Sequence, residues 1–127
     1  MKTKILIIED DQFLREFLFK KLSEENFEVL AAKEGKEGVE LAQKEKPDLI
    51  LLDLILPEKN GYEVLEDLKK NPLTSEIPVL VLSNLGQKEE IEEAFRKGAK
   101  DYLIKAYFSL EEIVSKIRLL LKKQKKD

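Results

Sequence analysis

The chain has 127 residues, which is enough for one domain with its own hydrophobic core and too few for a second. Hydrophobic residues make up 43% of it and charged residues 39%, a composition typical of a packed core inside a strongly charged surface. The absence of cysteine and histidine excludes disulfides, thiolate nucleophiles and sites built on imidazole. Carboxylates, hydroxyls and ammonium groups remain, and these suit hard metal ions and phosphate.

Charge and the lengths of the apolar runs restrict the partners and the location. A net charge of -3 argues against direct nucleic-acid binding, which requires a basic surface. The exception is a basic tail, residues 122–127, which we interpret as a solvated helix end or the start of a linker after a domain of residues 1–121. The apolar runs are far shorter than the roughly 20 residues that cross a bilayer, and no signal peptide is recognisable. We therefore expect a cytoplasmic protein without membrane contact.

Five short apolar segments alternate with five amphipathic ones, a pattern that predicts β-α units around a parallel sheet. We expect strands at residues 4–8, 27–31, 48–52, 78–82 and 101–104. Three of these are continuously apolar at their centres, as in strands covered on both faces. Right-handed crossovers place helices on both sides of such a sheet. The sequence therefore predicts an α/β fold in three layers, with five strands and five helices.

The helix signals are local. Residues 12–24 are predicted to form the first helix, with Leu14, Phe17, Leu18 and Leu22 facing the sheet. The last helix is expected to begin after Ser109, which has a glutamate three residues later as in a capping box. The third helix is bounded by residues 60–61 and 71–72, and residue 98, a glycine, is expected to end the fourth in a left-handed conformation.

Ligands of doubly wound sheets bind beyond the carboxyl ends of the strands, so the residues that follow each strand are the candidates for a site. The polar residues at these positions are Glu9, Asp10 and Asp11 after the first strand, Asp53 after the third, Ser83 and Asn84 after the fourth, and Lys105 after the fifth.

The acidic cluster predicts a cation. Glu9, Asp10, Asp11 and Asp53 would repel one another and raise their own pKa values unless a cation lay among them. Ligands that are all oxygen, with an incomplete set, suit magnesium better than calcium or zinc. In the alternative interpretation, Asp10 and Asp11 cap the first helix and Glu9 is solvated.

Asp53 is the candidate nucleophile, because it stands alone between the apolar runs 49–52 and 54–57, where a buried carboxylate is costly. Carboxylates can attack phosphorus when a metal ion and a cation take up the charge of the transition state. Lys105 would supply that cation, and the Ser83 hydroxyl could bind a phosphoryl oxygen. Taken singly, Lys105 is better explained as a surface lysine at the end of a strand, and Ser83 as a loop serine with a local hydrogen bond.

The segment 5–10, Asp53 with Pro57 and Gly61, Ser83, and the segment 98–105 together resemble the receiver domains of bacterial response regulators of two-component systems, chemotaxis regulators among them. The resemblance covers nearly the whole chain. It implies a flavodoxin-like sheet of strand order 2-1-3-4-5. It also implies that Asp53 is the phosphoacceptor, supplied by the phosphohistidine of a sensor histidine kinase or of a phosphotransfer protein.

The resemblance also assigns roles to the other candidates. Glu9, Asp10, Asp53 and the backbone carbonyl of Ile55 would hold Mg²⁺, with Mn²⁺ as a substitute, and Asp10 is the first choice for direct coordination. Ser83 and Lys105 would hold the phosphoryl group. Tyr102 would be the aromatic switch that turns inward when Ser83 moves, or, alternatively, only a packing residue of the fifth strand.

The implied function is a regulatory switch and not an enzyme, apart from slow self-phosphorylation and self-dephosphorylation. The face made by the fourth helix, the fifth strand and the last helix would control a downstream effector or bind a second copy of the chain. No cofactor besides the metal ion is implied.

The sequence departs from the family at two positions. Ala106 replaces the proline that usually follows the lysine, and because a cis bond without proline costs roughly 2.5 to 4 kcal/mol, we expect a trans peptide. Asn84 replaces a smaller residue, usually alanine, after the hydroxyl position, and we expect it to narrow the site.

Three other functions compete with this interpretation. A flavin-binding protein would share the fold, but the first strand-helix loop carries acids where a flavin phosphate requires hydroxyls or amides. A phosphatase that forms an aspartyl-phosphate would have a second acid two residues after the nucleophile, and Ile55 stands there. A scaffold that binds partners without being phosphorylated remains as the third alternative.

Overall fold

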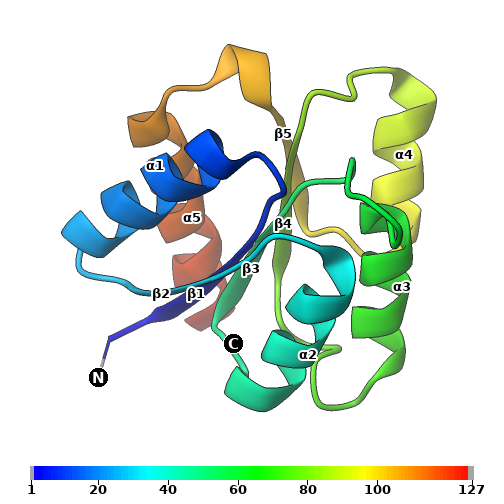
Figure 1. Cartoon of the computed structure of the whole chain (residues 1–127), viewed down its shortest axis with the longest axis horizontal. Coiled ribbons are helices and arrows are strands. Elements are labelled where there is room, and N and C mark those ends of the chain that lie inside the picture. Colours follow the sequence, from blue (N-terminus) through cyan, green and yellow to red (C-terminus); the bar gives the residue numbers. More distant parts are fainter. Residues whose placement is uncertain (1, 126–127) are drawn as a thin grey trace.

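The protein is described by a computed structural model that covers residues 2–125 and contains one parallel sheet (Figure 1). The strand order is β2-β1-β3-β4-β5, which confirms the predicted 2-1-3-4-5 topology. The strands are β1 (Lys4–Ile8), β2 (Glu28–Ala32), β3 (Leu49–Leu52), β4 (Val79–Ser83) and β5 (Asp101–Ile104).

Three strands, β2, β3 and β4, begin one residue later than predicted, and hydrogen bonding explains the shift of β2 and β4. The amide of Phe27 donates to the carbonyl of Leu22 at 3.1 Å, so Phe27 belongs to the turn that leaves the first helix and not to β2. Pro78 has no amide hydrogen and cannot donate to the sheet. Strands β2 and β4 also end one residue later than predicted, so β4 includes Ser83, whereas β3 ends at Leu52 as predicted.

Helices cover both faces of the sheet (Figure 1). On one face lie α1 (Gln12–Glu24) and α5 (Leu110–Lys125), and on the other lie α2 (Gly35–Glu45), α3 (Gly61–Lys70) and α4 (Lys88–Arg96). A short 3-10 turn, η1 (Lys105–Tyr107), joins β5 to α5. Within residues 2–125, no helix combines the length and the apolar character needed to span a membrane.

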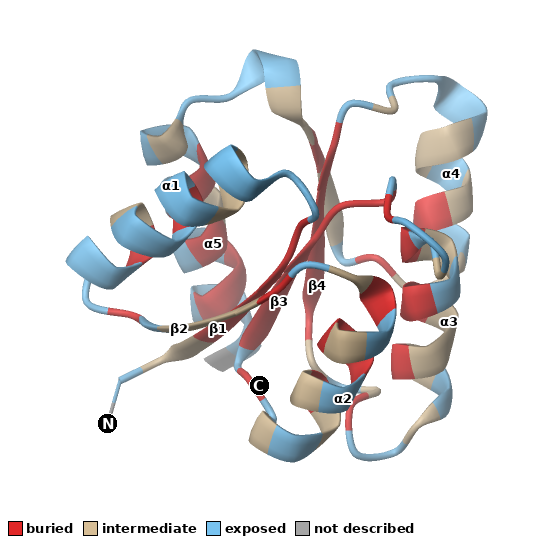
Figure 2. Ribbon diagram, in the orientation of Figure 1, coloured by how far each residue is buried: buried red, intermediate tan, exposed pale blue. Residues whose placement is uncertain are grey.

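The sheet separates two hydrophobic cores, as the predicted three layers require. Along β1, Ile5 and Ile7 pack toward α1 and α5, whereas Leu6 and Ile8 pack toward α2 and α3. The central strands β1, β3 and β4 are buried along most of their length, whereas the edge strands β2 and β5 are mostly half-buried (Figure 2), and each helix buries only the side that faces the sheet. Continuous apolar runs are thus explained by burial on both faces.

The predicted helix boundaries are mostly confirmed. The backbone amide of Glu112 donates to Ser109 Oγ at 3.1 Å and the amide of Ser109 donates to Glu112 Oε1 at 2.8 Å, which is the expected capping box. Gly98 follows α4 with a φ of 113°, in the left-handed region. Helix α5 continues through Lys125, so most of the basic tail is helical, while residues 126–127 lie outside the described residues.

The predicted orientation of Phe17 was wrong. Leu18 and Leu22 are buried and Leu14 is partly buried, but Phe17 is 59% exposed, and Phe13 is 74% exposed. The contact stripe of α1 follows residues 14, 18 and 22, and each residue of a helix is rotated by about 100° from the one before it. Phe17 therefore lies on the flank of the helix and not beneath it.

We predict that Gly61→Ala destabilises the fold. A Cβ at residue 61 would lie 2.6 Å from the backbone oxygen of Asp53 and would also collide with the Cα of Leu54, neither of which is a flexible side chain. Overpacking of this kind costs about 1 to 3 kcal/mol of unfolding free energy, measurable by urea titration.

Gly86→Ala is the matched control. Its Cβ would meet the Cδ1 of Ile104 at 3.4 Å, an ordinary contact, so the unfolding free energy should change by less than about 0.5 kcal/mol. Equal stability of the two variants would contradict the close approach at Gly61.

Candidate functional site

Two neighbouring strand ends carry the buried acids. The amide of Asp53 donates to the carbonyl of Ile8 at 3.0 Å, and the amide of Glu9 donates to the carbonyl of Ala32 at 3.0 Å. These bonds continue the sheet by one residue beyond β1 and β3. Neighbouring strands lie about 4.8 Å apart, so side chains that leave the sheet at the same level meet.

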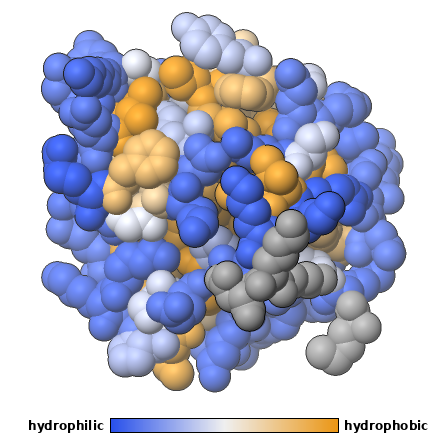
Figure 3. Space-filling view, turned by 180° about the vertical axis from the view of Figure 1, so that it is seen from behind, coloured by the Kyte–Doolittle hydropathy of each residue, from blue (hydrophilic) through white to orange (hydrophobic). Residues whose placement is uncertain are grey.

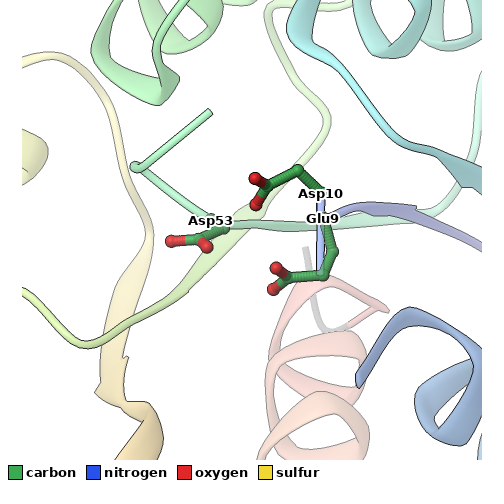
Figure 4. A group of neighbouring side chains, drawn as sticks. All are labelled: Glu9, Asp10 and Asp53. Atoms are coloured by element: carbon green, nitrogen blue, oxygen red, sulfur yellow. The ribbon is translucent and has the colours of Figure 1, made fainter. Parts of the chain in front are cut away.

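Three carboxylates from these strand ends surround a common space (Figure 4). One oxygen each from Glu9, Asp10 and Asp53 lies within 4.8 Å of the others. Glu9 is 2% exposed and Asp53 is 4% exposed, whereas Asp10 is open to solvent. A cluster of hard oxygen ligands with one open side fits a divalent cation that keeps part of its water shell.

Lys105 supplies a positive charge within this cluster. Its Nζ lies 2.8 Å from Asp53 Oδ2 and 2.9 Å from Glu9 Oε1. Burial by itself would lower the pKa of Lys105, but the bonds to Asp53 and Glu9 outweigh it and raise the pKa above its usual value. Lys105 is therefore not an ordinary surface lysine.

The pKa of Glu9 is raised from 4.5 to about 7. Burial is the main cause, and the negative charge of Asp53 adds to it, while hydrogen bonds from Lys105 and from the amide of Asp11 oppose the shift. In the absence of a further cation, the site thus favours a protonated Glu9 below neutral pH.

The three consecutive acids after β1 have two different roles. Asp11 caps α1, because its Oδ1 accepts from the amide of Leu14 at 3.1 Å. The amide of Asp11 in turn donates to Glu9 Oε2 at 3.1 Å. The capping interpretation thus holds for Asp11, whereas Glu9 is buried and Asp10 belongs to the carboxylate cluster.

Ser83 and Tyr102 meet at the loop that follows β4. Ser83 is fully buried, and its Oγ accepts from the amide of Leu85 at 3.4 Å. The Tyr102 hydroxyl donates to the carbonyl of Leu85 at 2.5 Å. Burial raises the pKa of Tyr102 to about 12, although a hydrogen bond with Ser83 opposes the shift. Tyr102 is therefore partly buried against the core, and its hydroxyl is tied to the residue two positions after Ser83.

The remaining predicted positions lie at the rim. The amide of Ile55 donates to Asp53 Oδ1 at 3.2 Å, and the Ile55 side chain is 54% exposed. The Lys105–Ala106 peptide is trans, as expected for a peptide bond without proline. Asn84 is exposed to solvent.

No pattern in the sequence pointed to Arg15, which contacts the acidic loop. Its Nη1 donates to the carbonyl of Glu9 at 2.9 Å and to that of Asp10 at 3.3 Å. In the sequence, Arg15 is one basic residue among several on an amphipathic helix. Its partners are backbone carbonyls, which every residue type has, so the identities of Glu9 and Asp10 do not reveal the contact.

Comparison with known proteins gives consistent results. Residues 5–118 match the response regulator receiver domain family. The chain is 39% identical over 120 residues to the DNA-binding dual master transcriptional regulator RpaA of Synechocystis sp., which aligns 94% of this chain with 49% of RpaA. It is 38% identical over 122 residues to the response regulator ArlR of Staphylococcus saprophyticus, which aligns 96% of this chain with 54% of ArlR. The chain thus spans about half the length of these relatives.

Solved structures agree on the fold. The CheY-like response regulator receiver domain protein of Methanospirillum hungatei superposes with a TM-score of 0.92 at 27% identity, over 99% of this chain and 98% of that one.

We predict that Glu9 makes the stability of the metal-free protein depend on pH. Folded Glu9 holds its proton up to about pH 7, whereas an unperturbed glutamate loses it near 4.5. Between these values the folded state binds more protons than the unfolded state, so the contribution of Glu9 to stability falls as the pH rises. Glu9→Gln removes the titration. The unfolding free energy of the variant relative to wild type should increase between about pH 5 and pH 8, by on the order of 1 to 3 kcal/mol.

Urea titrations with a chelator present measure this difference, and Glu16→Gln, an exposed glutamate of α1, is the control. A constant difference between Glu9→Gln and wild type across this range would contradict the raised pKa.

Proposed function

Because this chain belongs to the response regulator receiver domain family, we propose that it is a phosphorylation-dependent switch of a two-component system whose phosphoacceptor is Asp53. The observation that carries the proposal is the ion pair of the buried Asp53 with Lys105 beside two further acids. The donor is the phosphohistidine of a sensor histidine kinase or of a phosphotransfer protein, and we expect the exchange to take place in the cytoplasm.

In the transfer, an oxygen of Asp53 forms a bond to phosphorus as the bond from phosphorus to the donor nitrogen breaks, and the electron pair stays on the imidazole. The reaction needs charge stabilisation more than covalent assistance. Lys105 lies within hydrogen-bond distance of Asp53. Its ammonium group would donate hydrogen bonds to the phosphoryl oxygens during the transfer. Ser83, at the end of β4, offers a hydroxyl to the same group.

We assign the divalent cation, Mg²⁺ or Mn²⁺, to Glu9, Asp10, Asp53 and the backbone carbonyl of Ile55. The cation would neutralise charge on the carboxylates and the phosphoryl oxygens. Asp10 is the first choice for direct coordination, because its carboxylate belongs to the cluster and is open to solvent.

Phosphorylation of Asp53 would affect the surface through the contacts that link Ser83, Leu85 and Tyr102. Movement of Ser83 toward a phosphoryl group would shift Leu85, whose carbonyl holds the Tyr102 hydroxyl. Helix α4, strand β5 and helix α5 lie on the side seen in Figure 3, where hydrophobic patches interrupt the charged surface. Phe95 on α4 and Leu119 on α5 are exposed. We propose that this face binds an effector or a second copy of the chain.

We assign residues 1–121 to the receiver domain and residues 122–127 to a basic tail or the start of a linker. The relatives support a regulatory output that lies outside the receiver domain. RpaA is described as DNA-binding, and the chain spans about half of it. The carboxylate cluster and its lysine favour a phosphorylated switch over a scaffold that is never modified, because a scaffold needs no buried acids.

We predict that the protein gains one phosphoryl group when incubated with Mg²⁺ and acetyl phosphate, and that Asp53→Asn does not, because the amide is not a nucleophile toward phosphorus. Intact mass measures the transfer. Asp48→Asn, which alters an aspartate at the opposite end of β3, is the control and should be labelled like wild type. Equal labelling of Asp53→Asn and wild type would refute the assignment.

We further predict that phosphorylation shifts backbone NMR signals of α4, β5 and the start of α5 as well as those of the site, because Tyr102 connects the β4-α4 loop to β5. Tyr102→Phe lacks the bonding hydroxyl and should transmit less of the change to α4. Shifts confined to the loops around Asp53 would contradict a switch at this face.

A further inference from the structure

Arg15 is the one basic side chain of α1 that contacts the acidic loop in the part of the chain that the structure describes. Its guanidinium does not bind a carboxylate there. Instead, Nη1 donates to two consecutive backbone carbonyls, those of Glu9 at 2.9 Å and of Asp10 at 3.3 Å. Arg15 is itself half-buried, and its backbone amide is fixed in the first turn of α1 by a bond to the carbonyl of Asp11 at 2.9 Å.

This contact lies just beyond the last sheet bond along β1, which the amide of Glu9 donates to the carbonyl of Ala32. The paired register of β1 ends at Ile8, whose carbonyl accepts from the amide of Asp53. The carbonyls of Glu9 and Asp10 come after that point. One guanidinium that holds both carbonyls fixes the orientation of two consecutive peptide planes, and the direction of each Cα–Cβ bond follows from those planes.

The side chain that depends most on this is Asp10. Packing holds Glu9, which is buried, but Asp10 is exposed and yet contributes to the carboxylate cluster. Its direction toward Asp53 is therefore set by the backbone of its own loop. Residues behind the direct ligands of a metal commonly set their orientation in this way.

We propose that Arg15 is a positioning residue for the divalent-cation site, acting through the backbone carbonyls of Glu9 and Asp10. The inference rests on the proposed function for the existence of that cation. If Arg15 acts by positioning, its removal has the opposite effect on metal affinity from the one that its charge predicts. A nearby positive charge repels a divalent cation, so removal of the charge by itself would tighten metal binding. Removal of a positioning contact weakens it.

The experiment compares Arg15→Gln, Arg15→Lys and Lys20→Gln by Mg²⁺ titration followed through backbone NMR signals. Arg15→Gln is expected to bind Mg²⁺ about tenfold more weakly than wild type, the size of effect typical of residues behind a metal ligand. Arg15→Lys keeps the charge but loses the fork of donors, and it should lie between wild type and Arg15→Gln. Lys20 is exposed on the same helix, so Lys20→Gln removes an equal charge and should leave the affinity within about twofold of wild type. Unchanged or tighter binding by Arg15→Gln would overturn the proposal.

A second measurement needs no metal. The amide of Asp11 donates to Glu9 Oε2, so its hydrogen exchange in the presence of a chelator reports the order of the loop. Arg15→Gln should exchange this amide faster while the amides of β1 keep their wild-type rates, and Lys20→Gln should change neither. Unchanged exchange at Asp11 would overturn the proposal, as would equal acceleration throughout β1, which would indicate a loss of global stability. If wild type itself failed to bind Mg²⁺, the proposed cation site would fall, and the exchange of Asp11 would still decide what Arg15 does.

Discussion

The buried pair of Asp53 and Lys105, with Glu9 as the second partner of the lysine, is the interaction on which the arrangement of the strand ends depends. A carboxylate with 4% exposure is costly to keep ionised unless an opposite charge lies beside it. Leaving one member of such a pair without its partner typically costs about 3 to 5 kcal/mol. Since Glu9, Asp53 and Lys105 follow β1, β3 and β5, the three strands must end at the same edge of the sheet, and Lys105 must reach past the end of β4.

The same three residues explain why a cation and a phosphoryl group suit this site. Lys105 partly neutralises two acids, but burial and, to a smaller extent, the charge of Asp53 still raise the pKa of Glu9, so an imbalance remains in which the charged form of Glu9 is disfavoured. A divalent cation would relieve that imbalance from the open side, where Asp10 lies. Asp11 is engaged in capping α1 and is not available for this task.

Helix α4 has the fewest buried residues of the five helices in the described part of the chain. Ala94 is its one buried residue, whereas α3 buries four. Two tyrosine hydroxyls contribute to holding its first turn and the loop before it: Tyr62 donates to the carbonyl of Glu90 at 3.0 Å, and Tyr102 donates to that of Leu85. An element with few buried contacts has low local stability and can shift without unfolding the domain. A displacement of Ser83 can therefore be expressed at this helix while the sheet stays fixed.

The sequence by itself determined the class of fold and the position of the candidate site. Apolar runs of four to five residues alternating with helical stripes specify a covered parallel sheet, because both periods follow from local backbone geometry. The glycine at residue 98 and the box at Ser109 are local signals of the same kind, and both were confirmed. The rule that ligands lie beyond the carboxyl ends of strands placed the acids, Ser83 and Lys105 together. The strand order came from the resemblance, not from these patterns.

Only the tertiary structure decided the role of each residue at the site and the contacts that each side chain makes. The separation of Asp11 as a helix cap from Asp10 as a cluster member depends on side-chain directions that a run of three acids does not reveal. Phe17 was misplaced because its distance from the centre of the stripe is a matter of how α1 sits on the sheet. The contacts of Arg15 and Tyr102 are made to backbone carbonyls, and every residue type carries a carbonyl. Such partners are chosen by distance in the folded chain, so no pattern of residue types can specify them.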